Sequence, residues 1–378
     1  MVKRNSFLLL ALVLLASLCA VYAAQPEPEL RLLKGPYLQN VTCSSMVLMW
    51  ETNQPSDSRV DFGQTADYAS RADDAALSTI HTVTLLGLQA DTRYHYRISS
   101  TREGQAISSE DNSFQTAVAA GTPFRFAVYG DSRSFPKDHA QVIEGIIGSH
   151  PRFVIHTGDF VSDGNEYDQW QRDYFDPSQP LLRTTPMYPC LGNHEEGAEW
   201  YYRFFSPPSG GGRHNKQWYA FDYGDAHFVV IDTDVDFSPA SEQYKWLRAD
   251  LESSPAEWLF VVHHHPAFSS GSHGGDKKVQ QFLVPLYQQY RVDMVFNGHD
   301  HLYERSHKDE VYYIVTGGGG APLYPTLNTP NPNRQVSKMA HHFCSVEIDG
   351  ETTTLQACGD GVVFDSVVLH HPVGFERQ

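Results

Sequence analysis

The hydrophobic pattern of this 378-residue chain changes at residues 121–123, and no other sequence feature limits the possible folds as much. Before that point, from 31 to about 118, short alternating segments are separated by turn residues, which is typical of an antiparallel sandwich. After it, the apolar segments Phe124–Tyr129 and Phe153–His156 flank helical spacing at 138–149. This pattern predicts a strand–helix–strand unit. We therefore expect an all-β unit followed by an α/β unit.

Further segments extend both patterns. In the all-β unit, strands are predicted at 46–50, 59–62, 80–85 and 94–98. In the α/β unit, helices are predicted at 241–252 and 277–290, each followed by an apolar strand, at Trp258–Val262 and 292–296. The tail from 342 to 369 returns to alternating strands, and we expect these strands to extend the sheets of the α/β unit instead of forming a third domain.

The first residues have the pattern of an export signal. Lys3 and Arg4 precede an apolar run at 7–16, which is followed by small residues up to Ala23. The run is too short for a bilayer-spanning helix, which needs about 20 apolar residues. We predict a signal peptide at 1–23 and a secreted or periplasmic protein. Cys19 suggests a lipoprotein signal instead, but a bulky leucine precedes it where a small residue is usual.

The charge balance limits the possible partners. Removing residues 1–23 takes away two basic and no acidic residues, which leaves 45 acidic against 26 basic residues and a net charge of −19. A protein that binds a nucleic acid polymer normally has a basic surface, so we expect no such partner. Nor does an apolar stretch of membrane length follow the signal, so no membrane span is expected. The sequence does not indicate the oligomeric state.

Four cysteines remain after the predicted signal, namely Cys43, Cys190, Cys344 and Cys358. An exported protein can form disulfides. A hairpin that turns at Asp349-Gly350 would place Cys344 opposite Leu355 and Cys358 on the other face of the sheet. We therefore predict no specific disulfide.

Potential metal ligands recur after apolar strands or turns, several of them directly after glycine. They are Gly130-Asp131, Gly158-Asp159, Gly192-Asn193, Gly298-His299, His301 and the triplet His263-His264-His265. One Gly-Asp pair is usually an ordinary turn, because glycine readily adopts a positive φ. Several within about 170 residues, at the strand ends where α/β sheets bind ligands, favour a common site.

The types of ligand narrow the chemistry. Carboxylate oxygen, amide oxygen and imidazole nitrogen together suit Mn, Fe or Zn more than copper or an iron–sulfur cluster. Six donors exceed the need of one tetrahedral ion, and a carboxylate can bridge two ions. The chain has no His-Glu-x-x-His motif, and the glycine run 317–320 lacks the Lys-Ser/Thr of a phosphate-binding loop. We expect that run to be a turn that permits close packing.

As an ordered set, five motifs resemble the calcineurin-like metallophosphoesterases, and specifically the branch similar to purple acid phosphatases. They are Gly130-Asp131-Ser132-Arg133, Gly158-Asp159-Phe160-Val161-Ser162, Gly192-Asn193-His194-Glu195, Val261-Val262-His263-His264 and Gly298-His299-Asp300-His301. In addition, residues 88–94 resemble the tyrosine corner of fibronectin type III domains. The resemblance implies an α/β fold: a four-layer αββα sandwich at 122–372 behind an all-β, fibronectin III-like domain at 29–118.

The resemblance also implies the positions of two divalent or trivalent ions, with Fe, Zn or Mn expected. Asp131 and His301 would hold one ion. The other would be held by Asn193, His264 and His299, and Asp159 would bridge the two. Within the histidine triplet, the family spacing to the following proline selects His264.

Two residues depart from the family pattern. Ser162 stands where purple members have a tyrosine that colours ferric iron, so a colourless protein is expected. Arg133 ends the first motif, where the purple branch usually has glycine and other phosphoesterases often have a histidine ligand. Arg133 is either a donor to the substrate phosphate or a surface or structural arginine.

Two histidines are candidates for catalysis. His194 follows the proposed ligand Asn193 and is the best candidate for protonating the leaving group. His273 lies in a Ser-Gly-Ser-His-Gly-Gly loop, where the resemblance implies a substrate-facing histidine. An exposed loop residue is the alternative.

The sequence thus predicts an exported dinuclear phosphomonoesterase that cleaves small phosphoesters with hydroxide generated at the metals. A phosphodiesterase acting on nucleotides or phospholipid head groups is the first alternative, because no residue in the sequence distinguishes a phosphomonoester substrate from a phosphodiester substrate. A catalytically inert secreted binding protein is the second.

Overall fold

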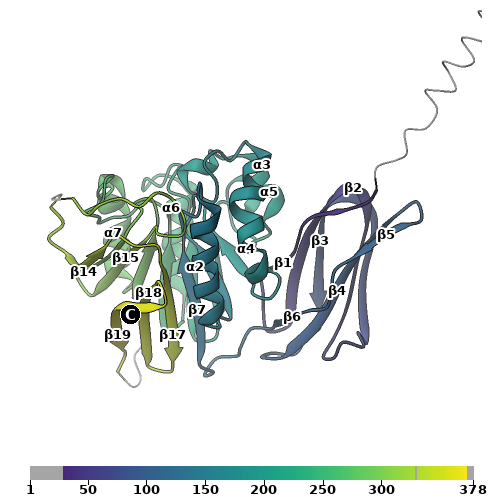
Figure 1. The fold of residues 1–378 in the computed structure, drawn as a ribbon. Coiled ribbons are helices and arrows are strands. Elements are labelled where there is room, and N and C mark those ends of the chain that lie inside the picture. The colour runs from purple at the N-terminus through teal and green to yellow at the C-terminus, as the bar shows by residue number, and fades with distance from the viewer. Residues whose placement is uncertain (1–28, 328–329, 373–378) are drawn as a thin grey trace, which may run out of the picture.

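The computed structural model describes residues 29–327 and 330–372, so the predicted signal at 1–23 lies outside the described residues. Figure 1 shows an all-β unit beside an α/β unit. Among the described residues, no helix is long and apolar enough to cross a membrane.

The all-β unit is built from long antiparallel hairpins. Its strands are β1 (Leu32–Gln39), β2 (Ser45–Gly63), β3 (Ser70–Leu86), β4 (Arg93–Arg102), β5 (Gln105–Ser108) and β6 (Asn112–Gln115). The strands predicted at 46–50 and 59–62 are one continuous strand, β2, so their separation was wrong. The register against β3 shifts between Glu51 and Ser58, because Pro55 cannot donate to a ladder and is accommodated at a bulge. At the predicted tyrosine corner, the Tyr94 hydroxyl accepts from the Gln89 backbone N–H at 3.0 Å.

The first sheet of the α/β unit combines parallel and antiparallel strands. Strands β7, β8 and β9 are parallel, and the C-terminal strands add to β7 antiparallel in the order β17, β18, β19. The expectation that the tail extends these sheets is confirmed. The strands are β7 (Phe124–Tyr129), β8 (Phe153–His156), β9 (Met187–Pro189), β17 (Phe343–Asp349), β18 (Thr352–Gly359) and β19 (Val362–His370). The same sheet continues into the all-β unit, because β1 pairs with β9 at Gln39 and Met187.

The second sheet has seven strands in the order β10-β11-β12-β13-β15-β14-β16. They are β10 (Tyr219–Tyr223), β11 (Ala226–Val230), β12 (Trp258–Val262), β13 (Met294–Asn297), β14 (Tyr303–Lys308), β15 (Val311–Thr316) and β16 (Arg334–Lys338). The four strands β11, β12, β13 and β15 are parallel.

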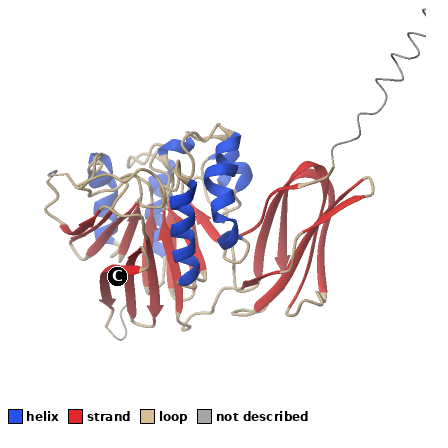
Figure 2. Ribbon diagram, viewed as in Figure 1, coloured by secondary structure: helices blue, strands red, loops and turns tan. Residues whose placement is uncertain are grey.

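Helices cover the outer faces of both sheets (Figure 2). On the first sheet lie α2 (Pro136–Gly148), α3 (Tyr167–Gln169), η1 (Trp170–Phe175), α4 (Asp176–Leu182) and α5 (Glu199–Phe204). On the second lie α6 (Glu242–Ser253), η4 (Val279–Leu283) and α7 (Val284–Gln289), and the short turns η2 (Asn193–Glu195) and η3 (Arg213–Asn215) lie in loops. The helix predicted at 277–290 is a π turn followed by an α-helix.

Aromatic side chains join the two sheets face to face. Phe126 and Phe153 of the first sheet stack at 5.2 Å, and both meet the edge of Phe228 in the second sheet, at 5.1 and 5.3 Å. Phe260 and Phe296 extend the same buried cluster. Burial of one such side chain contributes about 1.5–3 kcal/mol. Two sheets packed in this way, with helices outside, form the expected four-layer αββα sandwich.

The C-terminal hairpin has a different register from the predicted one. Cys344 lies opposite Ala357, not Leu355, because the turn is centred one residue later and Asp349 pairs with Thr352. A shift of two residues keeps every side chain on its face. Accordingly, Cys344 lies in the core between the sheets, whereas Cys358 packs toward α2.

Candidate metal centre

The six predicted ligands lie at the carboxyl ends of strands from both sheets. Asp131 follows β7, Asp159 follows β8 and Asn193 follows β9, while His264 and His299 follow β12 and β13. Parallel strands end at the same edge of a sheet, and the two sheets pack face to face, so both edges meet at one place. His301 comes from the loop after His299. These six residues are called the ligand cluster below.

The donor atoms of the ligand cluster face one another. Side-chain atoms of Asp131, Asp159 and His264 all lie within 4.8 Å of one another. The Asn193 Oδ1 atom lies 3.1 Å from His264 Nε2 and 3.0 Å from His299 Nδ1. On the other side, His301 Nε2 lies 3.4 Å from Asp131 Oδ1. The structure therefore brings all six predicted ligands together.

Three of the ligand residues have a left-handed backbone. The φ angles are 56° at Asp131, 58° at Asp159 and 72° at His299. This conformation is uncommon for residues other than glycine and occurs often at functional sites. It turns the chain sharply at the strand end, which directs each of these side chains back across the sheet edge.

The glycines before the ligands are required mainly for space. A Cβ atom on Gly192 would lie 2.3 Å from Asp159 Oδ1, and one on Gly298 would lie 2.4 Å from Asp131 Oδ2. The run 317–320 packs equally closely, since a Cβ on Gly317 would lie 2.8 Å from Asp131 Oδ2. This confirms the expected close packing of that run.

The histidine tautomers favour a cation between the side chains. The Nδ1 atoms of His264 and His301 lie 2.9 and 2.7 Å from the carbonyl oxygens of Thr157 and Pro322, so both must carry hydrogen there. In a neutral ring the Nε2 atom then presents a lone pair. For His264 that lone pair lies 3.3 Å from Asp159 Oδ1, and two acceptors at this distance repel unless a proton or a metal ion lies between them. The donor set therefore fits a metal centre.

The pKa values in the cluster favour one positive charge, at His264, and disfavour a second at His299. Burial lowers the pKa of His264, but the facing Asp159 carboxylate outweighs burial and raises it to about 10. Burial raises the pKa of Asp159, but His264 outweighs burial in turn and lowers it. Burial and the charge of His264 lower the pKa of His299 to about 2. Without metal, a proton on His264 would thus supply the charge that a cation supplies when bound.

Glu195 was part of a motif but had no predicted role. Its buried carboxylate accepts from the backbone N–H groups of Asp159, Phe160 and Gly192 at 2.8–2.9 Å. It therefore connects the loops after β8 and β9 and fixes the turn that presents Asp159. The only sequence signal for this role is its place in Gly192-Asn193-His194-Glu195.

His194 lies beside the cluster with one ring nitrogen directed to it. Nδ1 donates to the Ser162 carbonyl oxygen at 2.7 Å, and Nε2 lies 3.8 Å from Asp159 Oδ2. The backbone N–H of His194 also donates to Asp159 Oδ1 at 3.1 Å. Ser162 itself, which replaces the family tyrosine, has its hydroxyl 3.0 Å from that of Ser134.

Arg133 lies in the cluster and not on the surface. Its Nε atom lies 3.6 Å from Asp159 Oδ2, and its Nη2 atom lies 3.5 Å from His301 Nε2. The Nε atom is buried and has no hydrogen-bond partner among the described residues. Tyr324, which the sequence did not indicate, stacks on His301 with ring centroids 4.1 Å apart.

His273 lies at the exposed rim of the cluster. Its ring centroid is 4.2 Å from that of His299. The loop is held by the buried Asp300, which accepts from the His273 backbone N–H at 2.9 Å and also contacts the Ser269 hydroxyl. Asp300 belongs to a predicted motif, but its role depends on a contact with a distant loop that sequence patterns do not reveal.

The structure also separates the histidine triplet. His264 reaches the carboxylates, whereas His263 is buried beside Asn297, whose Nδ2 atom lies 3.0 Å from His263 Nδ1. His265 lies on the outer side of the cluster, with its ring 4.4 Å from that of His299 and its Nδ1 atom 2.9 Å from the Thr233 hydroxyl.

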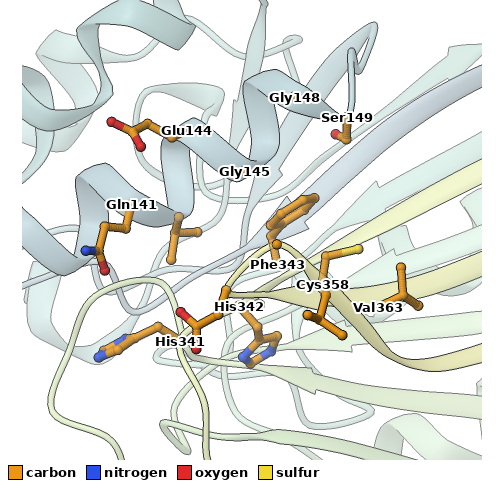
Figure 3. A pocket seen from close by; sticks show the side chains of 15 residues that line it. Gln141, Glu144, Gly145, Gly148, Ser149, His341, His342, Phe343, Cys358 and Val363 are labelled. Atoms are coloured by element: carbon orange, nitrogen blue, oxygen red, sulfur yellow. The ribbon is translucent and has the colours of Figure 1, made fainter.

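A separate pocket of about 570 Å³ lies between α2 and the β18–β19 hairpin (Figure 3). Phe343, Cys358 and Val363 contribute to its largely apolar lining. None of the predicted site residues lines it. The pocket is therefore no substitute for the ligand cluster as a reaction site.

Comparison with known families agrees with this geometry. Residues 124–303 match the calcineurin-like phosphoesterase family, and residues 36–116 match the N-terminal domain of purple acid phosphatases. The chain contains a calcineurin-like phosphoesterase domain preceded by a purple acid phosphatase N-terminal domain. The matched phosphoesterase region contains every residue of the ligand cluster.

This chain is similar to several proteins that are named phosphatases. It is 30% identical over 289 residues to purple acid phosphatase 23 of Arabidopsis thaliana, covering 64% of this chain and 62% of that protein. It is 27% identical over 397 residues to acid phosphatase type 7 of Mus musculus, covering 87% and 88%. The chain thus spans about six-tenths of the length of the Arabidopsis relative.

Solved structures share the fold of this chain. A purple acid phosphatase, PPD1, from yellow lupin seeds superimposes with a TM-score of 0.78 at 20% identity, covering 89% of this chain and 74% of that one. The structure of PhoD gives a TM-score of 0.68 at 12% identity, covering 92% and 90%. At these identities the likeness concerns the fold alone.

Proposed function

We propose that this protein is an exported, metal-dependent phosphomonoesterase with two metal ions. The observation that carries the proposal is the ligand cluster, in which His264 and His301 direct ring nitrogens at the Asp159 and Asp131 carboxylates. The two carboxylates and three imidazoles of the cluster are donors that Mn, Fe and Zn use in proteins. The phosphatase relatives support the reaction class.

Each ligand has a proposed place. Asp131 and His301 would hold one ion, Asn193, His264 and His299 the other, and Asp159 would bridge them. When bound, the ions would lower the pKa of a water molecule and neutralise charge on the phosphoryl group.

Three further residues act on the substrate in this proposal. Arg133, whose Nε atom has no hydrogen-bond partner among the described residues, donates to the substrate phosphate. His194 gives a proton from Nε2 to the leaving oxygen, because its Nδ1 is already committed to the Ser162 carbonyl. His273, at the exposed rim, contacts the phosphoester as it enters.

The organisation of the chain completes the proposal. We assign a signal peptide to 1–23, a fibronectin III-like domain to 29–118 and the catalytic domain to 122–372. The protein would be secreted or periplasmic and would act on small phosphoesters.

The test is hydrolysis of a chromogenic phosphomonoester and its diester by protein loaded separately with Mn, Zn or Fe. We expect the monoester to be cleaved faster, with two ions per chain measured on the same sample. Faster cleavage of the diester would replace the monoesterase with a phosphodiesterase. Inactivity on both esters with every metal, together with far less than one ion per chain, would indicate an inert binding protein.

A further inference from the structure

A polar pocket of about 490 Å³ lies at the junction of the all-β and α/β units. Arg93, the first residue of β4, and Ser113 of β6 line it from the all-β unit. From the α/β unit, it is lined by His150 and Arg152, which connect α2 to β8, and by Thr184, which connects α4 to β9. None of these five residues belongs to the ligand cluster. We call this hollow the junction pocket.

The lining of the junction pocket is unusual for such an acidic chain. The protein has 45 acidic and 28 basic residues, yet within the described ranges the junction pocket is lined by two arginines and a histidine and by no carboxylate. Ser113 and Thr184 add hydroxyl groups. This local reversal of charge, with several donors around one hollow, suits an anion.

Within the described residues, only one of the two arginines of the junction pocket has an acidic partner. Arg152 Nη2 lies 3.0 Å from Asp91 Oδ1, but that oxygen also accepts from Gln115 at 2.9 Å. The Nη1 atom of Arg152 is buried and lacks a hydrogen-bond partner in the described chain. For Arg93, no side-chain ion pair or hydrogen bond is formed with residues 29–327 or 330–372. Asp91 thus offsets only one of the two charges.

We propose that the junction pocket binds a tetrahedral oxyanion, a phosphate or sulfate group, between the two units. Guanidinium groups present paired N–H donors that match such oxygens, and a buried donor without a partner is costly until an acceptor arrives. Arg93 holds the anion from the all-β unit and Arg152 from the α/β unit, with Ser113 donating from its hydroxyl. The proposal stands on the junction pocket alone and does not depend on phosphoesterase activity.

The experiment is calorimetric titration of full-length protein with sodium sulfate at constant ionic strength. It is done in an Asp159→Ala background, so that the ligand cluster contributes little binding. We expect one sulfate per chain, bound about tenfold more weakly after Arg93→Gln, the loss expected for one charge-assisted hydrogen bond. The matched control is Arg31→Gln, which removes the same charge from an exposed residue of the same unit that is not in the junction pocket.

A second measurement locates the anion. Crystals of the unsubstituted protein soaked in tungstate should show an anomalous peak between Arg93 and Arg152, and crystals of the Arg93→Gln variant should lose it. A peak at the ligand cluster only would overturn the proposal. Equal weakening by Arg93→Gln and Arg31→Gln would also overturn it, because the effect would then be general charge screening. Inorganic phosphate titrated in parallel distinguishes a phosphate from a sulfate preference.

Discussion

The two units of this protein each bury a polar cluster around histidine, and the clusters are satisfied in different ways. In the all-β unit, His81 is surrounded by the hydroxyls of Thr52, Ser56 and Ser58, which we call the hydroxyl cluster. His81 Nε2 lies 2.8 Å from the Thr52 hydroxyl, and Nδ1 lies 2.8 Å from that of Ser58. The Thr52 hydroxyl donates to the Gln54 carbonyl oxygen at 2.8 Å, so it accepts from His81 Nε2, and the Ser58 hydroxyl, which can donate or accept, donates to Nδ1. A neutral His81 is therefore satisfied.

The ligand cluster of the α/β unit contains no hydroxyl group that could match its histidines in this way. Carboxylate oxygens accept only, and the committed Nδ1 atoms leave the Nε2 lone pairs of His264 and His301 facing them. Burial lowers the pKa of His81 to about 4, whereas burial is outweighed at His264, whose pKa rises to about 10. Burial of a histidine alone therefore does not indicate a metal site. A buried histidine lone pair that faces a carboxylate oxygen does indicate one.

The largest effect should follow loss of the bridging carboxylate. Asp159→Ala removes the acceptor shared by both halves of the ligand cluster, so metal content should fall and phosphoester hydrolysis should drop ~10³-fold or more, because several kcal/mol of charge stabilisation is lost. Metal analysis and initial rates on the same sample measure this. Asp168→Ala, at an exposed residue of α3, is the matched control. Retention of two ions by Asp159→Ala would contradict the assignment.

The next largest effect should come from His194. His194→Ala removes a proton donor but no ligand, so turnover should fall by ~10²–10⁴-fold while metal content stays at the wild-type value. The loss should be smaller for a substrate with a good leaving group such as a nitrophenolate, which needs less protonation. Equal loss for good and poor leaving groups would instead assign His194 to binding. A variant that loses metal would make it part of the metal centre.

The sequence predicted that the six residues of the ligand cluster come together, because each part of the signal is local. Each of the five motifs joins an apolar strand to a short run with a ligand, and parallel strands necessarily end together. Glu195, Asp300 and Tyr324 were not given roles, since their contacts are with loops distant in sequence. The reason for the glycines was also only partly foreseen. Gly192 and Gly298 leave space for carboxylates. A positive φ occurs at Gly158 as expected, but also at the predicted ligands Asp131, Asp159 and His299.

The fold was predicted less evenly. Strand identity followed from alternation, but the extent of β2 and the register of β17 against β18 did not. A bulge that accommodates Pro55, or a turn moved by one residue, changes little in the local hydrophobic pattern. Tertiary packing on both faces selects between such alternatives, and a single sequence contains no record of that selection.

A smaller effect tests the hydroxyl cluster. His81 is neutral when folded, with its pKa lowered to about 4 by burial, whereas an unfolded histidine titrates near 6.5. As the pH falls from about 6.5 to 4 the unfolded chain takes up a proton that the folded chain does not, so stability should fall, by on the order of 1–2 kcal/mol. Denaturant unfolding across this range measures it. In the His81→Gln variant, the free energy of unfolding should depend less on pH over this range. An unchanged slope would contradict the claim that His81 is held neutral in the folded protein.

The smallest effect has the opposite sign and concerns His227 on β11. Burial lowers its pKa, but hydrogen bonds to Asp222 and Asp250 outweigh burial and raise it to about 9. Its contribution to stability is therefore complete below about pH 6.5 and is lost as the pH rises through about 9. Because Asp222 is largely exposed, we expect less than about 1 kcal/mol. The free energies of unfolding of His227→Gln and of the wild type, measured between pH 6 and 10, should converge at the alkaline end. Convergence at the acidic end instead would mean that His227 is held neutral, like His81.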